Sequence, residues 1–176
     1  MLQLNVILYN IRNIYNVGSI FRTADGAGAN KIYLCGITPA PLDRFNRLRP
    51  QFAKVALGAE RQVAWDASAR SLPATLKLIA SLKNDGAKIF ALEQTAVTVP
   101  YQRGKFLAGE RKPGKATTRG KRGARKAVLI LGNEVRGLPG SILKRADAVL
   151  EIPMRGSKES LNVAVAFGIA AYSLVQ

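Results

Sequence analysis

The chain has 176 residues, 48% of them hydrophobic, and its 27 basic and 11 acidic residues give a net charge of +16. This length supports one domain with a sizeable core, over residues 1–176, because two separate cores would each be small. The absence of histidine and the single cysteine, Cys35, exclude a Ser-His-Asp triad, an ordinary zinc site and an intrachain disulfide. We therefore expect a cytoplasmic protein without metal, and the lack of a long uncharged apolar run predicts no membrane span.

The excess of positive charge indicates a polyanionic partner. A net charge of +16 on a chain of this size attracts phosphates, and nucleic acid is a more natural partner than an anionic membrane surface.

Short apolar runs alternate with helical patterns along the whole chain. We expect strands at residues 4–9, 31–36, 61–65, 87–93, 127–132 and 148–153. We expect helices at residues 17–29, 71–86 and 160–175, and partly helical structure at 44–57. Such alternation predicts an α/β fold with a mostly parallel sheet that is flanked by helices on both faces.

One segment, residues 103–126, interrupts this pattern. It carries ten basic residues and one acidic residue, so +9 of the +16 charge lies in 24 residues, together with five glycines. Because it has almost no apolar periodicity, we expect a flexible insert between two strands that contacts the phosphates of a nucleic acid. The alternative is a solvated loop without a role. The expected contacts are Arg103, Lys105, Arg111, Lys112, Lys115, Arg119, Lys121 and Arg122.

Two nucleotide-binding motifs are incomplete. Residues 109–117, "GERKPGKAT", resemble a phosphate-binding loop, but Ala116 stands where a hydroxyl is needed. Residues 25–30, "DGAGAN", have two of the dinucleotide glycines but lack the third, and they end a helix rather than begin one. The sequence therefore argues against a nucleotide-dependent enzyme.

Three other segments combine glycine with polar residues next to strands or helices. The first has Asn16, Gly18, Arg22 and Gly28 around one short helix. The second, "LILGNEVRGLP" at 129–139, ends a buried strand, and Asn133 and Glu134 are expected to project from it, where ligands of parallel sheets bind. The third, "IPMRGSKESLNVAVAF" at 152–167, leads into an apolar helix for which Ser160 is the expected N-cap.

In this order, the three segments resemble the three motifs of the SpoU (TrmH) family of RNA ribose methyltransferases, in the SPOUT superfamily. The first motif is matched by Asn16, Gly18, Arg22, Ala24 and Gly28, and the second by Leu131, Gly132, Glu134, Gly137 and Leu138. The third is matched by Ile152, Pro153, Met154, Gly156, Ser160, Leu161, Asn162 and Val163. The position after "LNV", usually serine in the family, is Ala164.

The resemblance implies a C-terminal deep trefoil knot that binds S-adenosylmethionine, and a homodimer that completes the active site. The residues expected to hold the cofactor are Leu92, Glu93, Leu131, Gly132, Ile152, Pro153, Met154, Ser160 and Leu161. The residues expected to take part in catalysis are Arg22, Asn16, Glu134, Ser160 and Asn162.

In this resemblance, Arg22 activates the ribose 2′-hydroxyl and also contacts RNA. A guanidinium is charged at neutral pH, so Arg22 is expected to stabilise the developing alkoxide, and it acts as a base only if its surroundings remove its proton. Asn16 and Asn162 are expected to orient Arg22 or the ribose, and Glu134 to hold Arg22 or the catalytic loop.

The substrate is expected to be transfer RNA or ribosomal RNA, with a slight preference for transfer RNA. Many relatives carry a separate N-terminal RNA-binding domain, and the basic insert is expected to replace it. Two alternatives stay open, namely an RNA-binding protein on the same fold without catalysis, and a SPOUT enzyme that methylates a base.

Overall fold

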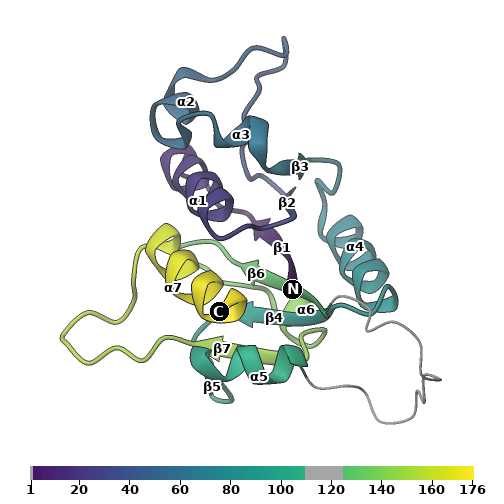
Figure 1. The fold of residues 1–176 in the computed structure, drawn as a ribbon, viewed down its shortest axis with the longest axis vertical. Coiled ribbons are helices and arrows are strands. Elements are labelled where there is room, and N and C mark those ends of the chain that lie inside the picture. Colours follow the sequence, from purple (N-terminus) through teal and green to yellow (C-terminus); the bar gives the residue numbers. More distant parts are fainter. Residues whose placement is uncertain (1, 110–124) are drawn as a thin grey trace.

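A parallel sheet of seven strands forms the centre of the protein (Figure 1), as seen in a computed structural model that describes residues 2–109 and 125–176. The strand order is β3-β2-β1-β6-β4-β7-β5, and every neighbouring pair is parallel. The strands are β1 (Leu2–Tyr9), β2 (Lys31–Cys35), β3 (Ala64–Asp66), β4 (Lys88–Leu92), β5 (Val99–Pro100), β6 (Arg125–Leu131) and β7 (Ala148–Glu151). The predicted α/β class and parallel sheet are confirmed.

Helices cover both faces of the sheet because its strands are apolar on both sides. Along β6, Val128 and Ile130 belong to one buried cluster, whereas Leu129 and Leu131 belong to the other. This alternation follows from the two-residue period of a strand. The helical segments are α1 (Ile14–Gly26), α2 (Pro50–Ala56), α3 (Ala59–Gln62), α4 (Leu72–Asn84), η1 (Tyr101–Arg103), α5 (Gly104–Gly109), α6 (Gly140–Leu143) and α7 (Val163–Val175).

The two clusters are closed by different helices. In the first cluster, Phe21 of α1 meets Phe52 of α2 edge to face, with ring centroids 5.1 Å apart, and Phe167 of α7 is also buried there. In the second, Ile79 of α4 and Ile142 of α6 pack on the opposite face of the sheet. Among the described residues, no helix combines the length and apolar character needed to cross a bilayer.

The last helix begins later than predicted. The sequence placed its start at residue 160 with Ser160 as N-cap, but α7 begins at Val163 and its N-cap is Asn162. The Asn162 side chain accepts a hydrogen bond from the Ala164 amide at 2.9 Å. Asparagine and serine are equally good caps, so the local sequence did not distinguish the two positions.

The insert is shorter than the predicted 103–126. Residues 104–109 form α5, and residues 125–126 begin β6. A Cβ on Gly104 would lie 2.8 Å from a methyl carbon of Leu174, so α5 packs closely on α7, and this contact stabilises a helix that its own sequence favours only weakly. The remaining part, 110–124, lies outside the described residues.

Candidate functional site

Three side chains from distant parts of the chain form one hydrogen-bonded row. Asn16 of α1 donates from Nδ2 to Oε1 of Glu134 at 3.1 Å. Asn162, at the start of α7, donates from Nδ2 to Oδ1 of Asn16, also at 3.1 Å. We call these three residues the polar row. One residue of each predicted motif therefore meets the other two, although 118 and 146 residues separate them from Asn16 along the chain.

The sheet brings these residues together because all its strands point the same way. The α1 helix follows β1, Glu134 follows β6, and the loop before α7 follows β7. The carboxyl ends of parallel strands lie at one edge of the sheet, where ligands of such sheets commonly bind. The polar row lies at this edge, where Glu134 and Asn162 are exposed to solvent and Asn16 is half-buried.

The loop after β6 is held by Asn133, which we had expected to project from it. The Asn133 side chain is only 9% exposed and accepts hydrogen bonds from the amides of Val135 and Arg136. Its Nδ2 donates to the carbonyl oxygen of Asn10 at 2.9 Å. Asn133 is therefore a structural residue, and it fixes the turn from which Glu134 projects.

The backbone of this loop is packed too closely for side chains at two positions. Gly137 has a φ of +63°, and a Cβ there would overlap the Glu93 carboxylate. A Cβ on Gly132 would lie 2.7 Å from the carbonyl carbon of Gly137 and 2.8 Å from the Leu138 nitrogen. The two glycines thus allow the loop to close over the end of β4.

Several residues predicted to hold a cofactor lie at the carboxyl ends of β4 and its neighbouring strands. Leu92 pairs with Leu131 on one side and with Leu150 on the other, so β4 lies between β6 and β7. Gln94, which the sequence analysis missed, donates from Nε2 to the Glu159 carbonyl oxygen at 2.9 Å. This bond ties the segment after β4 to the segment after β7.

The predicted cofactor residues differ in their exposure. Leu92 and Leu131 are buried, Glu93, Ile152 and Met154 are half-buried, and Pro153, Ser160 and Leu161 are exposed. The backbone of the 152–161 segment therefore borders solvent next to the buried ends of β4 and β6.

Glu93 lies under the loop, where its Oε1 accepts a hydrogen bond from the Leu138 amide at 3.4 Å. Burial raises the pKa of this carboxyl above its ordinary value of 4.5, and the Leu138 hydrogen bond opposes the shift only in part. The folded protein therefore binds this proton more tightly than the unfolded chain does. Its contribution to stability is fully present below pH 4.5 and is lost as the pH rises through the folded-state pKa.

We accordingly expect Glu93→Gln to raise the stability at neutral pH. Glutamine keeps a carbonyl oxygen for the Leu138 amide but carries no charge to bury. The stability difference from the native protein should grow as the pH rises from acidic to neutral, which urea unfolding at a series of pH values measures. Glu93→Ala, which removes the acceptor, should be less stable than Glu93→Gln throughout. A difference between Glu93→Gln and native protein that does not change with pH would contradict this expectation.

Arg22 does not contact the polar row. It is six residues from Asn16 on α1, so the two side chains leave the helix about 120° apart. Arg22 instead faces α2 and α3, where it lines a cavity of about 430 Å³ with Leu57, Gly58 and Arg61. Within one chain, Asn16 and Glu134 bond to each other and Asn16 to Asn162 rather than to Arg22, and their expected roles toward Arg22, the ribose or the catalytic loop stay predictions.

Gly18, one helical turn before Arg22, explains why α1 and α2 come so close. A Cβ on Gly18 would lie 2.5 Å from a methyl carbon of Val55 and 3.1 Å from the Phe52 carbonyl oxygen. Gly18 and Arg22 thus share one face of α1, as predicted, and that face is turned toward α2.

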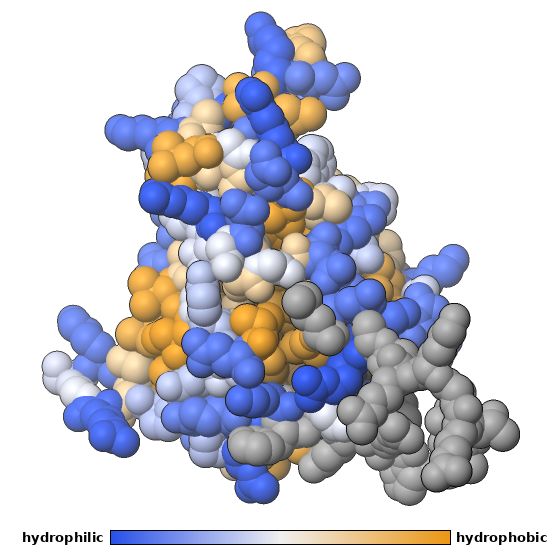
Figure 2. Space-filling model, viewed as in Figure 1, coloured by the Kyte–Doolittle hydropathy of each residue, from blue (hydrophilic) through white to orange (hydrophobic). Residues whose placement is uncertain are grey.

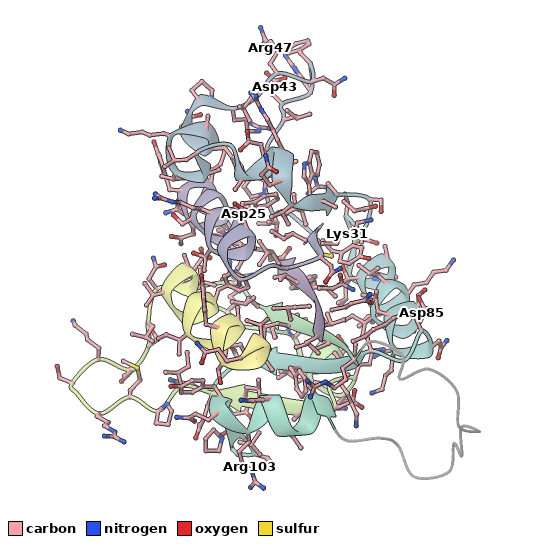
Figure 3. All side chains as sticks on the ribbon, in the orientation of Figure 1. Asp25, Lys31, Asp43, Arg47, Asp85 and Arg103 are labelled. Atoms are coloured by element: carbon pink, nitrogen blue, oxygen red, sulfur yellow. The ribbon has the colours of Figure 1, made fainter. Side chains whose placement is uncertain are left out.

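Two of the predicted RNA contacts can be placed. Arg103 in η1 and Lys105 in α5 are both exposed, and Figure 3 shows Arg103 pointing away from the sheet. The other basic residues of the insert lie outside the described residues, namely Arg111, Lys112, Lys115, Arg119, Lys121 and Arg122.

The fold and this edge define an α/β protein with its candidate site at the carboxyl ends of parallel strands. The model of the SpoU rRNA Methylase family matches residues 3–172, and the chain belongs to that family.

Similar proteins carry related descriptions. The chain is 32% identical to a 23S rRNA guanosine 2′-O-methyltransferase, RlmP of Bacillus subtilis, over 90% of this chain and 52% of that protein. It matches an AdoMet-bound rRNA methyltransferase from Sinorhizobium meliloti with a TM-score of 0.75 and 27% identity, over 98% of this chain and 55% of the other. A structure concerning the 2-OH methylation of C/U34 on tRNA matches with a TM-score of 0.70 and 27% identity, over 98% of this chain and 88% of the other.

The matches differ in how much of each relative they cover. The chain spans between 52% and 59% of the length of the curated relatives that it matches. The matched part includes all three segments that contribute to the polar row, because the family model extends from residue 3 to residue 172.

Proposed function

We propose that this chain is an S-adenosylmethionine-dependent methyltransferase that acts on the ribose 2′-hydroxyl of RNA. The observation that carries the proposal is the polar row, because it joins Asn16, Glu134 and Asn162 from the three family motifs into one site. The family membership supports the same conclusion, as do relatives named as guanosine 2′-O-methyltransferases of 23S rRNA.

The residues at the end of β4 suit S-adenosylmethionine. Gly132 and Gly137 let the loop after β6 pack against the end of β4, so that main-chain groups border this place, and the exposed Ser160 and Leu161 follow Glu159, which Gln94 ties to it. The backbone of the proposed cofactor residues would bind the adenosine and methionine parts; these residues are Leu92, Glu93, Leu131, Gly132, Ile152, Pro153, Met154, Ser160 and Leu161. When bound, the cofactor supplies an electrophilic methyl group.

The polar row and Arg22 would act on the ribose. Hydrogen bonds to Glu134 and Asn162 fix the orientation of the Asn16 amide, so the row presents a preorganised set of polar atoms to a hydroxyl group. The charged guanidinium of Arg22 would stabilise the alkoxide that develops as the 2′-hydroxyl loses its proton. In this proposal Ser160 is a further hydroxyl near the reacting group.

A homodimer would bring Arg22 to the reaction. Within one chain Arg22 faces α2 and α3, away from the polar row, so a second copy is needed to place the two together. Apolar side chains on α7 and α1 offer a surface for this contact, since Val165 is 53%, Tyr172 42% and Tyr15 45% exposed. Figure 2 shows apolar patches over the region of α7.

We further propose that the C-terminal part forms a trefoil knot and that 1–176 is one SPOUT domain. The strand order supports the knot. After β4 the chain forms β5 at the edge of the sheet, crosses to form β6 on the other side of β4, and then returns so that β7 lies between β4 and β5. The bond from Gln94 to Glu159 holds the crossing segments together.

The proposed partner is RNA in the cytoplasm. The curated relatives act on 23S rRNA according to their names, which favours ribosomal RNA, and the match to a protein of tRNA 2-OH methylation makes transfer RNA the second candidate. Arg103 and Lys105 are exposed cations that would contact phosphates, and the basic residues of 110–124 extend this set.

The test is transfer of a labelled methyl group from S-adenosylmethionine to ribosomal RNA and, separately, to transfer RNA. We expect incorporation that yields an alkali-resistant dinucleotide, because a methylated 2′-oxygen cannot attack the neighbouring phosphate. DNA of the same sequence, which lacks the 2′-hydroxyl, is the matched control and should stay unlabelled. Label that is released as a modified base would favour the base-methylating alternative, and RNA binding without cofactor binding would favour a non-catalytic protein.

A further inference from the structure

A short hairpin extends from the carboxyl edge of the sheet beyond β2. Leu42 and Leu48 pair as an antiparallel bridge, and the turn between them is closed by Asp43. The Asp43 carboxylate accepts hydrogen bonds from the amides of Phe45 and Arg47 at 2.8 and 3.0 Å. Asn46 completes the turn with a φ of +58°. We call residues 41–49 the β2 hairpin.

The tip of the β2 hairpin presents an aromatic ring between two cations. The Phe45 side chain is 59% exposed. The guanidinium carbons of Arg44 and Arg47 lie 4.7 and 4.9 Å from its ring centroid. A turn held by five hydrogen bonds thus displays an exposed aromatic ring together with positive charge, which is the combination that binds an unpaired base and its phosphate.

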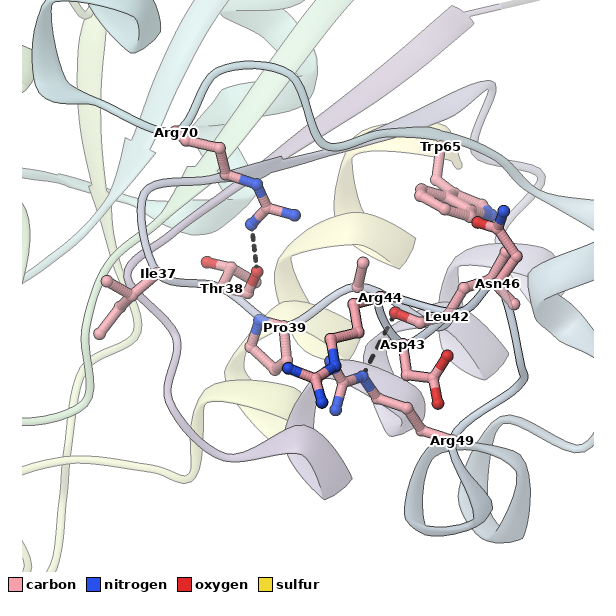
Figure 4. A pocket seen from close by; sticks show the side chains of 11 residues that line it. Ile37, Thr38, Pro39, Leu42, Asp43, Arg44, Asn46, Arg49, Trp65 and Arg70 are labelled. Carbon is pink, nitrogen blue, oxygen red and sulfur yellow. Dashed lines mark hydrogen bonds between the residues drawn. The ribbon is translucent and has the colours of Figure 1, made fainter.

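A basic cavity of about 520 Å³ lies at the foot of the β2 hairpin (Figure 4). Its lining includes Arg44, Arg49 and Arg70 and one acidic residue, Asp43. Asp43 is already engaged, because its Oδ2 accepts from Nε of Arg47 at 3.3 Å. The cavity therefore has an excess of positive charge that suits an anion.

Two of these arginines are held in place by backbone oxygens. Arg70 donates from Nη1 to the Thr38 carbonyl oxygen at 2.6 Å, and Arg49 donates from Nε to the Leu42 carbonyl oxygen at 3.3 Å. Each guanidinium has five N–H groups, so both keep further donors for a phosphate. Fixing the side chains in advance lowers the entropic cost of binding.

The segment that joins β2 to the β2 hairpin is tied to the loop that carries Glu134. Asn10, at a φ of +58° after β1, accepts a hydrogen bond on Oδ1 from the Ile37 amide at 3.0 Å. The Asn10 carbonyl oxygen accepts from Nδ2 of Asn133 at 2.9 Å. One residue therefore links the loop after β2 to the loop after β6, along the same edge of the sheet. Figure 3 places Asp43 and Arg47 at one end of the molecule, opposite Arg103.

Resting on the function proposed above, we propose that the β2 hairpin is a second RNA-binding element, which binds a single-stranded nucleotide flanking the one that is methylated. An unpaired base stacks on Phe45 between Arg44 and Arg47, and its phosphate lies in the cavity of Arg44, Arg49 and Arg70. The strand would thus run along the carboxyl edge of the sheet, from the polar row across Asn10 to β2. Stacking accepts any base, so this element contributes affinity and positions the strand without reading its sequence.

The test is the affinity of the full chain for a short fluorescent single-stranded RNA of mixed sequence, measured by anisotropy at several salt concentrations. We expect Phe45→Ala to weaken binding about tenfold, and Phe45→Trp to restore it, because either aromatic ring stacks on a base. Arg44→Gln should reduce the slope of log affinity against log salt by about 0.7, the value for one phosphate contact on a single strand. Val97→Ala and Lys77→Ala are matched controls at exposed positions and should bind as the native protein does.

Other outcomes separate this inference from the proposed function. If native protein transfers methyl groups and binds RNA, but Phe45→Ala and Arg44→Gln both bind as well as native, the inference alone is overturned. If Phe45→Ala weakens binding of duplex RNA as much as of single strands, the stacking on an unpaired base is overturned. No binding of RNA by the native protein would overturn both. Because Phe45 and Arg44 are exposed, thermal unfolding should show both variants folded.

Discussion

Gly132→Ala should destabilise the protein by about 1–3 kcal/mol, the usual cost of forcing extra atoms into a packed site, and should also abolish the proposed binding of S-adenosylmethionine. The added Cβ would meet the backbone of Gly137 and Leu138 at 2.7 and 2.8 Å, and backbone cannot rotate away as a side chain can. The loop after β6 would have to move off the end of β4, taking Glu134 out of the polar row. Urea unfolding and calorimetric titration with the cofactor measure the two effects.

Gly140→Ala is the matched control for this change. Gly140 lies in the same part of the chain, at the start of α6, and a Cβ there meets nothing within 4 Å. We expect its stability to stay within about 0.5 kcal/mol of native, with normal cofactor affinity. If Gly132→Ala also behaved like native protein in both measurements, the close packing of this loop would have no part in the site.

Arg22→Ala should reduce methyl transfer about 100-fold or more, because it removes the cation proposed to stabilise the alkoxide. The side chain is exposed, so stability should change little, and cofactor affinity should stay near native because Arg22 lies away from the end of β4. Single-turnover transfer of labelled methyl groups at saturating RNA separates this effect from weaker RNA binding.

Arg61→Ala tests whether the loss is specific to Arg22. Arg61 lines the same cavity, and 79% of its side chain is exposed, so it has the same charge in nearly the same place. We expect at most a small loss of transfer for Arg61→Ala. Equal losses for the two variants would mean that the cavity supplies only a general positive field and that Arg22 has no special role.

Mixing subunits tests the proposed dimer at the same time. If one subunit's Arg22 acts on the polar row of the other, Arg22→Ala and Asn16→Ala proteins, each inactive alone, should regain part of the activity when mixed. This follows because a mixed dimer holds one site with both native residues. No recovery after subunit exchange, which a mass difference between tagged subunits monitors, would mean that Arg22 serves its own chain.

The sequence predicted the sheet and its edge well because the signals are local. Apolar runs such as 127–132 marked buried strands, and the polar residues after them marked the carboxyl ends. The structure places residues of all three segments at that edge, where the sequence had predicted the second. It also corrected the N-cap of α7 from Ser160 to Asn162, since two good capping residues stand close together there.

Short elements stabilised by distant partners could not be predicted from the sequence. The α5 helix has two glycines among its six residues and packs on α7, which follows it by more than fifty residues. Asn133 looked like a projecting polar residue, but its side chain turns inward to the Asn10 carbonyl oxygen, 123 residues away in the chain. Hydrogen bonds of this kind leave no pattern in the local sequence.

By itself, the sequence determined the α/β class, the positive charge, and the three segments that share the family motifs, because apolar periodicity, composition and residue spacing are properties of the chain. Only the tertiary structure decided which side chains meet. The parallel strands bring Asn16, Glu134 and Asn162 into one row, whereas the turn of α1 directs Arg22 to another surface. The β2 hairpin likewise depends on how Asp43 closes its turn. Contacts between residues far apart in sequence follow from strand order and helix direction, which the folded chain alone fixes.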